Sequence, residues 1–178
     1  MNVTIRPVTL TDVPELTEVI KASREHLAPW EPIRDESFFT VAGQWKILDD
    51  LLNAGTGLPH VILVDGAIAG RVNLQTVVRG PFQSCTLGYW VAPAHGGRGV
   101  ASFAVGEVLR LAFTEYGLHR VEAATLLHNV RSQRVLAKNG FERFGMAPRY
   151  LNIAGDWQDH YLFQTVAENW LEQRKAES

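Results

Sequence analysis

The chain has 178 residues, is 46% hydrophobic and carries a formal net charge of −2. This length and apolar content suit one domain with a full core, and the weak charge argues against a general nucleic-acid binder, which would carry a basic face. No apolar run reaches the roughly 18 residues of a membrane span, and no signal-peptide pattern is present. Cys85 has no partner for an internal disulfide and is expected to be a small core residue rather than a nucleophile. We therefore expect one cytoplasmic domain over residues 1–178, with no membrane partner and no direct nucleic-acid role.

The first half of the chain predicts one strand, two helices and then three strands. Apolar residues alternate in the first segment and recur at helical spacing in the next two. Thr9, with Asp12 three residues on, is a candidate helix N-cap. Asp65-Gly66 is a tight-hairpin signal between two of the strands. The expected elements are a strand at Val3–Val8, helices at residues 10–26 and Ser37–Asn53, and strands at His60–Val64, Ala67–Val78 and Ser84–Val91.

The second half alternates helices and strands. A glycine-rich loop comes first, and Asn139-Gly140 and Ala154-Gly155-Asp156 separate later elements. The expected elements are helices at residues 100–116, 129–138 and 166–175, and strands at Leu118–Leu127, Phe141–Ile153 and Trp157–Thr165. This order predicts an α/β fold in which helices flank a mixed, mostly antiparallel central sheet.

The loop His95-Gly96-Gly97-Arg98-Gly99 joins a predicted strand to a predicted helix. Glycines let a backbone approach a ligand closely, and a helix start offers unpaired N–H groups, so the loop is a candidate anion site. No Gly-Lys-Ser/Thr closes it, so it is not a Walker loop, and its glycine spacing does not fit a dinucleotide fingerprint. A plain glycine-rich turn is the alternative.

Two further segments have both structural and functional interpretations. Gly88 lies inside a strand, which indicates either a structural β-bulge or a splayed strand whose free amides bind an extended, amide-bearing ligand. Asn129 is a natural N-cap for the helix that carries Ser132, yet both side chains could also contact a ligand. Arg131, Arg134 and Lys138 follow, either as a solvated helix face or as positive charge for a phosphate.

Taken together, these segments resemble the GCN5-related N-acetyltransferase (GNAT) superfamily from Val3 to Thr165. Gly99 and Ala101 match the last two marked positions of its acyl-CoA loop, Q/R-x-x-G-x-G/A, whereas Gly96 stands where Gln or Arg is usual. That departure removes a side chain but no backbone amide. Further strings resemble the ribosomal-protein-alanine N-acetyltransferases (RimJ/RimL type), namely Arg24-Glu25-His26-Leu27-x-x-Trp30, His119-Arg120-Val121-Glu122-Ala123, Asn129-x-x-Ser132, Ala137-Lys138-Asn139-Gly140-Phe141-Glu142, Tyr150-Leu151 and Trp157-Gln158-Asp159-His160.

The resemblance implies transfer of acetyl from acetyl-CoA, as cosubstrate and without a metal, to an amine that attacks the thioester directly. Ser132 takes the position of the residue that protonates the departing thiolate. Many relatives use a tyrosine farther along that helix, but Val135 and Leu136 lie there, so we expect no tyrosine to be available. The coenzyme-binding residues implied are Tyr89, Trp90, Val91, Gly96, Gly97, Arg98, Gly99, Val100, Ala101, Asn129, Ser132, Arg134 and Lys138.

The acceptor and the general base stay open at this stage. Glu31, Asp159 and His160 are the candidate bases, although the last two could instead form a structural ion pair. The leading hypothesis is a protein N-terminus as acceptor, with a ribosomal protein as one possibility. A small amine such as a polyamine, amino sugar or amino-acid-like toxin, or a non-catalytic acyl-CoA-binding module, are the alternatives, and both a monomer and a homodimer fit. The residues expected to line the acceptor site are Trp30, Glu31, Arg34, Asn73, Gln75 and Tyr150.

Overall fold

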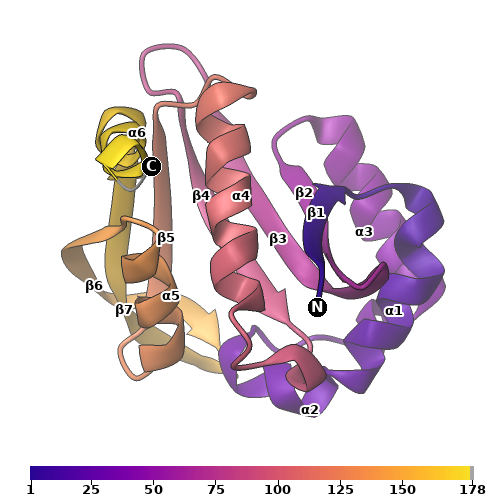
Figure 1. The fold of residues 1–178 in the computed structure, drawn as a ribbon. Coiled ribbons are helices and arrows are strands. Elements are labelled where there is room, and N and C mark those ends of the chain that lie inside the picture. The colour runs from indigo at the N-terminus through magenta and orange to yellow at the C-terminus, as the bar shows by residue number, and fades with distance from the viewer. Residues whose placement is uncertain (177–178) are drawn as a thin grey trace.

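A computed structural model describes residues 1–176 and confirms the predicted fold class. Seven strands form one sheet in the order β1-β2-β3-β4-β5-β7-β6 (Figure 1). Every neighbouring pair is antiparallel except β4 and β5, which run parallel. The strands are β1 (Val3–Pro7), β2 (Leu58–Val64), β3 (Ala67–Val78), β4 (Ser84–Val91), β5 (Arg120–Leu126), β6 (Glu142–Ile153) and β7 (Asp156–Val166).

Six α-helices cover this sheet: α1 (Val13–Ala22), α2 (Arg24–Leu27), α3 (Val41–Ala54), α4 (Val100–Thr114), α5 (Val130–Lys138) and α6 (Ala167–Ala176). Within residues 1–176, no helix is long and apolar enough to cross a membrane.

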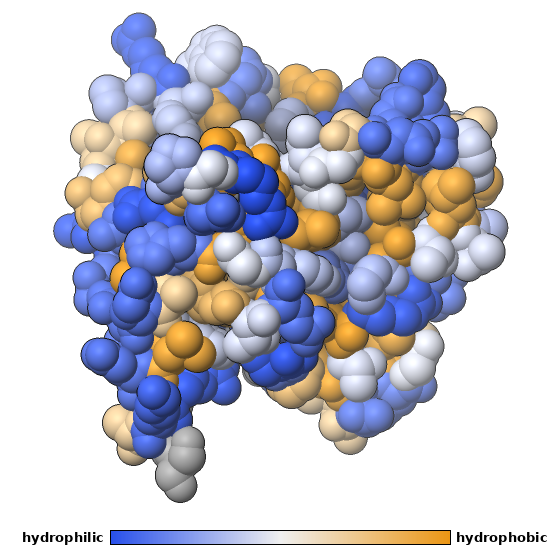
Figure 2. All heavy atoms as spheres, turned by 90° about the horizontal axis from the view of Figure 1, so that it is seen from above, coloured by the Kyte–Doolittle hydropathy of each residue, from blue (hydrophilic) through white to orange (hydrophobic). Residues whose placement is uncertain are grey.

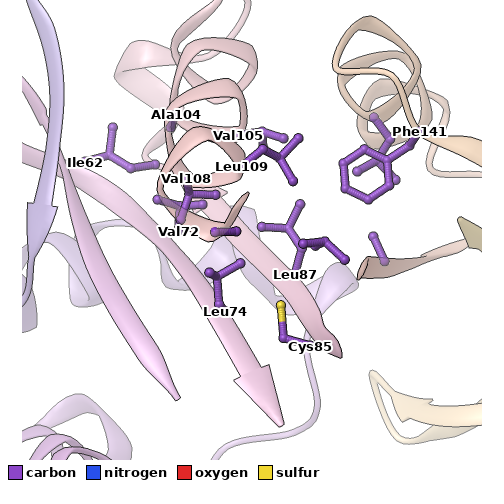
Figure 3. Close-up of a cluster of buried hydrophobic side chains, with 14 of the residues drawn as sticks. Ile62, Val72, Leu74, Cys85, Leu87, Ala104, Val105, Val108, Leu109 and Phe141 are labelled. Carbon is purple, nitrogen blue, oxygen red and sulfur yellow. The ribbon is translucent and has the colours of Figure 1, made fainter. Parts of the chain in front are cut away.

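Two apolar clusters hold the layers together, one on each face of the sheet. On one face, α4 packs its buried side, including Val105 and Leu109, against Val72 and Leu87 of the central strands (Figure 3). Cys85 lies in this cluster, as expected, and burial raises its pKa to about 12. On the other face, α1 and α3 pack against Val61 and Ile68. Burying such side chains is the main stabilising contribution to the fold.

Most of the predicted elements are confirmed, with differences where local hydrogen bonding competes. The helix expected over residues 10–26 is a 3₁₀ turn at Leu10–Asp12 followed by α1 and α2, which divide at Ser23. Asp12 accepts from the Thr9 N–H at 2.8 Å, so the expected capping pair forms, but on the 3₁₀ turn. The second helix also starts as a 3₁₀ turn (Glu36–Phe39), because Thr40 caps α3 by accepting from the Gly43 N–H at 3.1 Å.

The β4–α4 connection and the open end of the sheet lie together at the bottom of Figure 1. Figure 2 views the other end of the molecule, where hydrophilic and hydrophobic residues are interspersed. Helix α1 and the 3₁₀ turn Glu36–Phe39 pack against the face of the sheet opposite α4. A ligand at the open end of the sheet can therefore meet both faces.

Candidate active site

The loop between β4 and α4 adopts the conformation that its glycines predict. Gly97 and Gly99 have φ values of 74° and 81°, which L side chains rarely adopt. A Cβ atom added to either residue would meet no atom within 4 Å, so both face open space. The loop is therefore shaped by its backbone and leaves room for a ligand against it.

Five consecutive backbone amides of this loop are free of protein partners. Among residues 1–176, the N–H groups of Gly97, Arg98, Gly99, Val100 and Ala101 donate no hydrogen bond. They lead into the 15-residue helix α4, whose N-terminus carries partial positive charge. Such an array fits the pyrophosphate of a coenzyme. Gly96 does not belong to it, because its N–H already donates to the Pro93 carbonyl at 3.1 Å.

Strands β4 and β5 separate just beside this loop. They pair only between residues 84–86 and 120–122, although β4 continues to Val91 and β5 to Leu126. The end of β4 instead stays with β3, where a Cβ atom on Gly70 would lie 2.2 Å from the Trp90 carbonyl oxygen. The free edge of β4 can therefore hydrogen-bond an extended ligand that carries amides.

Gly88 lies within this unpaired part of β4, opposite Asn73 of β3. The β3–β4 register is regular at Gly88, and its irregularity falls farther along, between Gln75 and Val78. The prediction of a β-bulge at Gly88 is therefore wrong for the pairing with β3. The alternative, that β4 splays from its neighbour here, agrees with the loss of pairing between β4 and β5.

Helix α5 brings its first turn to the gap between the strands. Asn129 caps this helix by accepting from the Ser132 N–H at 3.2 Å, as its N-cap interpretation predicts. The Ser132 hydroxyl lies 2.7 Å from the hydroxyl of Tyr89, which comes from β4. Burial raises the pKa of Tyr89 to about 12, and the hydrogen bond with Ser132 opposes that rise. Helix α5 carries no tyrosine, as expected, but a tyrosine hydroxyl reaches Ser132 from β4 instead.

A cavity of about 200 Å³ lies on the opposite face of the sheet, beside the end of β4. Helices α1 and α2, the segment after them, and strands β3 and β4 contribute its walls, among them Arg24, Glu31, Arg34, Arg71 and Trp90. Trp90 belongs to both regions, since its side chain lines this cavity and its backbone lies on the free edge of β4.

Glu31 supplies the only carboxyl group among the described residues that line this cavity. Burial raises its pKa, while the charges of Arg34 and Arg71 lower it. Its carboxylate lies 4.0 Å from Arg34 Nε, and its side chain is 26% exposed. A carboxyl group with a raised pKa is a better proton acceptor than an ordinary surface glutamate, so it could serve as a general base.

The β6–β7 hairpin holds the segment that carries Glu31. The Ala154 N–H donates to the Glu31 carbonyl at 2.9 Å. The preceding residue, Trp30, packs its ring 5.5 Å from that of His128, in the turn between β5 and α5. Glu31 is therefore positioned from two sides by elements distant in the chain.

The other candidate bases have different surroundings. Asp159 accepts from the Arg149 N–H at 2.8 Å. His160 is 3% exposed, places Nδ1 2.9 Å from the Gln158 carbonyl and packs against the ring of Tyr150. None of these residues lines the cavity. Glu31 is thus the candidate base that the structure brings to it.

The remaining predicted residues lie around these regions. Trp30 and Tyr150 are exposed and do not line the cavity, and Gln75 is exposed on β3. Asn73, on the same strand, keeps a buried Oδ1 without a partner in the described chain. Arg98, Arg134 and Lys138 are exposed near the free amides and on α5, where they could meet phosphates.

Arg71, which is not among the predicted site residues, is 8% exposed and lines the cavity. Burial lowers its pKa to about 10, an effect that the charge of Glu31 opposes, and the guanidinium stays charged at neutral pH. The sequence offered one signal for this residue, a charge inside the mostly apolar strand segment Ile68–Leu74. Charged side chains are rarely buried unless they are paired, so such a position indicates a partner or a ligand. In the described part of the chain, no group of His, Cys, Asp and Glu side chains could hold a metal ion.

Comparison with known proteins identifies the family. The acetyltransferase (GNAT) domain matches residues 2–142. The chain belongs to this family. The [Ribosomal protein uS5]-alanine N-acetyltransferase of Escherichia coli (strain K12) is 33% identical over 165 residues, which cover 89% of this chain and 84% of that protein.

Two solved structures support the same resemblance. The ribosomal-protein-S5-alanine acetyltransferase from Vibrio fischeri superposes with a TM-score of 0.89 at 31% identity, covering 96% of each chain. Mycobacterium smegmatis RimJ in complex with CoA-disulfide gives a TM-score of 0.87 at 35% identity, covering 93% of this chain and 82% of that one. The predicted GNAT fold, the RimJ/RimL resemblance and the assignment to N-acetyltransferases are confirmed.

Proposed function

We propose that this GNAT acetyltransferase moves the acetyl group of acetyl-CoA to the N-terminal α-amine of a protein, such as a ribosomal protein. The relatives named for alanine acetylation of a ribosomal protein support this acceptor, and the RimJ structure in complex with CoA-disulfide supports the coenzyme. The observation that carries the proposal is the position of Trp90, where the free edge of β4 meets the cavity that contains Glu31. A thioester held along the backbone and an amine held in the cavity would meet there.

Coenzyme binding rests on main-chain groups. The five free amides of Gly97 to Ala101 bind the pyrophosphate, and the unpaired edge at Trp90 and Val91 holds the pantetheine arm and polarises the thioester carbonyl. Acetyl-CoA supplies an activated acetyl group as a thioester. Residues of the chain provide orientation and proton transfer.

Glu31 takes a proton from the attacking amine. An α-amine has a pKa near 7.7–8.0, so roughly a tenth of it is neutral at pH 7, whereas a lysine with a pKa near 10.4 leaves only about one in a few thousand neutral. A single half-buried carboxyl group with a raised pKa suits the α-amine, which loses its proton more readily than a lysine does. Ser132, with its hydroxyl against that of Tyr89, donates a proton to the departing thiolate.

Thiol release with acetyl-CoA and an unblocked peptide that starts with Ala or Ser tests the proposal. Mass spectrometry should find one added acetyl group on the N-terminal residue. The same peptide with a blocked N-terminus should release no thiol. Turnover with spermidine but not with the peptide would point to a small-amine enzyme, and coenzyme binding without turnover of either would point to a binding module.

A further inference from the structure

Arg71 is buried without a hydrogen-bonding partner. It lies on β3 between Val61 of β2 and Trp90 of β4, on the face of the sheet that borders the cavity. Its side chain makes no hydrogen bond or ion pair within residues 1–176, and its Nε is inaccessible to solvent. A guanidinium carries five N–H donors, and leaving the buried Nε–H unpaired is unfavourable. The two terminal nitrogens are unpaired but not enclosed, and Arg71 lines the cavity, so their donors fit a binding role better than a structural one.

Three further charged residues, Arg24, Glu31 and Arg34, line the cavity with Arg71. Glu31 is the nearest opposite charge, but no ion pair joins the two, and its carboxylate lies at 4.0 Å from Arg34 instead. Arg24 also lines the cavity and is paired with Glu36 outside it. The cavity thus offers one carboxylate to an amine, and next to it a guanidinium with free donors.

We propose that Arg71 binds the carbonyl oxygen of the acceptor's first residue while Glu31 holds its amine, so that the cavity selects α-amino-carbonyl compounds over polyamines. This inference rests on the proposed function and names the feature of the acceptor that is recognised. In a peptide N-terminus, the amine and the carbonyl are attached to the same carbon atom. A carboxylate and a guanidinium in one cavity can therefore bind both groups at once. Bidentate N–H donation to oxygen is what a guanidinium does best.

A polyamine lacks the oxygen that Arg71 needs. It would leave the guanidinium donors unpaired and would bring a second positive charge next to Arg71 and Arg34. A site that is built to hydrogen-bond one substrate group discriminates strongly against analogues without it.

Peptide binding to the CoA-loaded protein provides a test that needs no turnover. Calorimetry would compare an unblocked Ala-starting peptide, free alanine and spermidine on the wild type, Arg71→Met and Arg71→Lys. Arg71→Met should weaken peptide binding by about 10- to 100-fold, leave CoA binding unchanged and strengthen spermidine binding, because a repelling charge is removed. It should keep or raise Tm, because no hydrogen bond or ion pair within the described residues is lost. Arg71→Lys should recover part of the peptide affinity. Tighter binding of free alanine than of the peptide would assign the oxygen to a carboxylate rather than to a peptide carbonyl.

Arg110→Met is the matched control, because Arg110 is an exposed arginine on α4, distant from the cavity, that pairs with Glu107 and Glu115. It should leave the affinities for all three ligands unchanged. An equal loss for peptide and spermidine, or a fall in Tm with unchanged peptide affinity, would overturn the inference and assign Arg71 a structural role. If the wild type binds the peptide but transfers no acetyl group, the proposed function fails while the recognition by Arg71 stands.

Discussion

The regions that we propose for the coenzyme and for the acceptor, here called the coenzyme side and the acceptor side, are built in different ways. The coenzyme side uses main-chain groups from one continuous segment, the end of β4, the glycine loop and the start of α4. The acceptor cavity uses side chains from separate segments, with Glu31 after α2 and Arg71 on β3. Backbone amides offer the same chemistry whatever the side chains, whereas a cavity lined by side chains changes with each substitution. One side suits a cosubstrate shared by a family and the other suits a specific acceptor.

This comparison is tested first and most strongly by Glu31→Gln. The variant removes the proton acceptor but keeps the shape of the cavity, so kcat with an Ala-starting peptide should fall by about 100-fold or more, while the affinity for acetyl-CoA stays constant. A thiol-release assay would measure kcat, and calorimetry would measure the affinity for acetyl-CoA. Glu18→Gln, on an exposed glutamate of α1, is the control and should change neither.

The pH dependence sharpens the same prediction. Burial raises the pKa of Glu31, so the ionised base is lost at a higher pH than for an ordinary glutamate. The wild-type kcat should therefore fall as the pH drops through that raised pKa, and Glu31→Gln should lose this limb. An unchanged profile would remove Glu31 from the proton transfer.

The coenzyme side is tested by Gly99→Val. A valine would resist the φ of 81° at this position and displace the free amides, so CoA affinity should fall by about 10- to 100-fold. Gly80→Val is the matched control. Gly80 has a similar φ of 73° and open space around it, but it lies in the β3–β4 turn and not in the loop. Both variants should lose similar stability, and only the first should lose affinity. Equal CoA affinities in the two variants would contradict the pyrophosphate assignment.

Tyr89→Phe tests the contact between β4 and α5 on the coenzyme side. Without its hydroxyl, Ser132 loses its 2.7 Å partner, and kcat should fall by about 10-fold at constant acetyl-CoA affinity. Ser132→Ala should likewise lower turnover without loss of affinity, and the double variant should be no worse than the more impaired single one. Tyr116→Phe, which removes a tyrosine hydroxyl 2.8 Å from His60, should cost stability only. Additive losses in the double variant would mean that the two hydroxyls act independently.

The smallest expected effect concerns the anchoring of α1, which contributes Ile20 to the wall of the cavity. Asp12 forms two hydrogen bonds with Arg6 at 2.7 and 2.8 Å, and these lower its pKa to about 2. Because the pKa is lower in the folded state, the stabilisation is present above the unfolded value of 3.8 and is lost as the pH falls towards 2. The contribution is about 1 to 2 kcal/mol, since half-exposed Arg6 is screened by solvent. Denaturant unfolding of Asp12→Asn should show that loss at pH 7 and little further loss in acid. Equal acid sensitivity of both proteins would contradict it.

The elements and the loop could be predicted because their signals are local. Glycine spacing, the Asp65-Gly66 turn and the Asn129 cap each depend on a few neighbouring residues. Other features depend on how the strands pair. One is the hydrogen bond between Tyr89 and Ser132, which are 43 positions apart. Another is the placement of Glu31 and Arg71 in the same cavity. Strand alternation places Tyr89 and Leu87 on one face, but only the assembled fold shows that α5 lies there. Asp159 and Glu31 could not be ranked as bases from sequence because burial decides between them.

The central claim is that the loop amides hold the coenzyme and the cavity holds the acceptor, and one amide-resolved NMR titration tests both halves. Added CoA should shift the amide signals of Gly97 to Ala101 most, and leave the Nε–H signal of Arg71 unchanged until an Ala-starting peptide follows. Saturation by CoA with those five amides unmoved, or an Arg71 signal that responds to the coenzyme alone, would contradict the account.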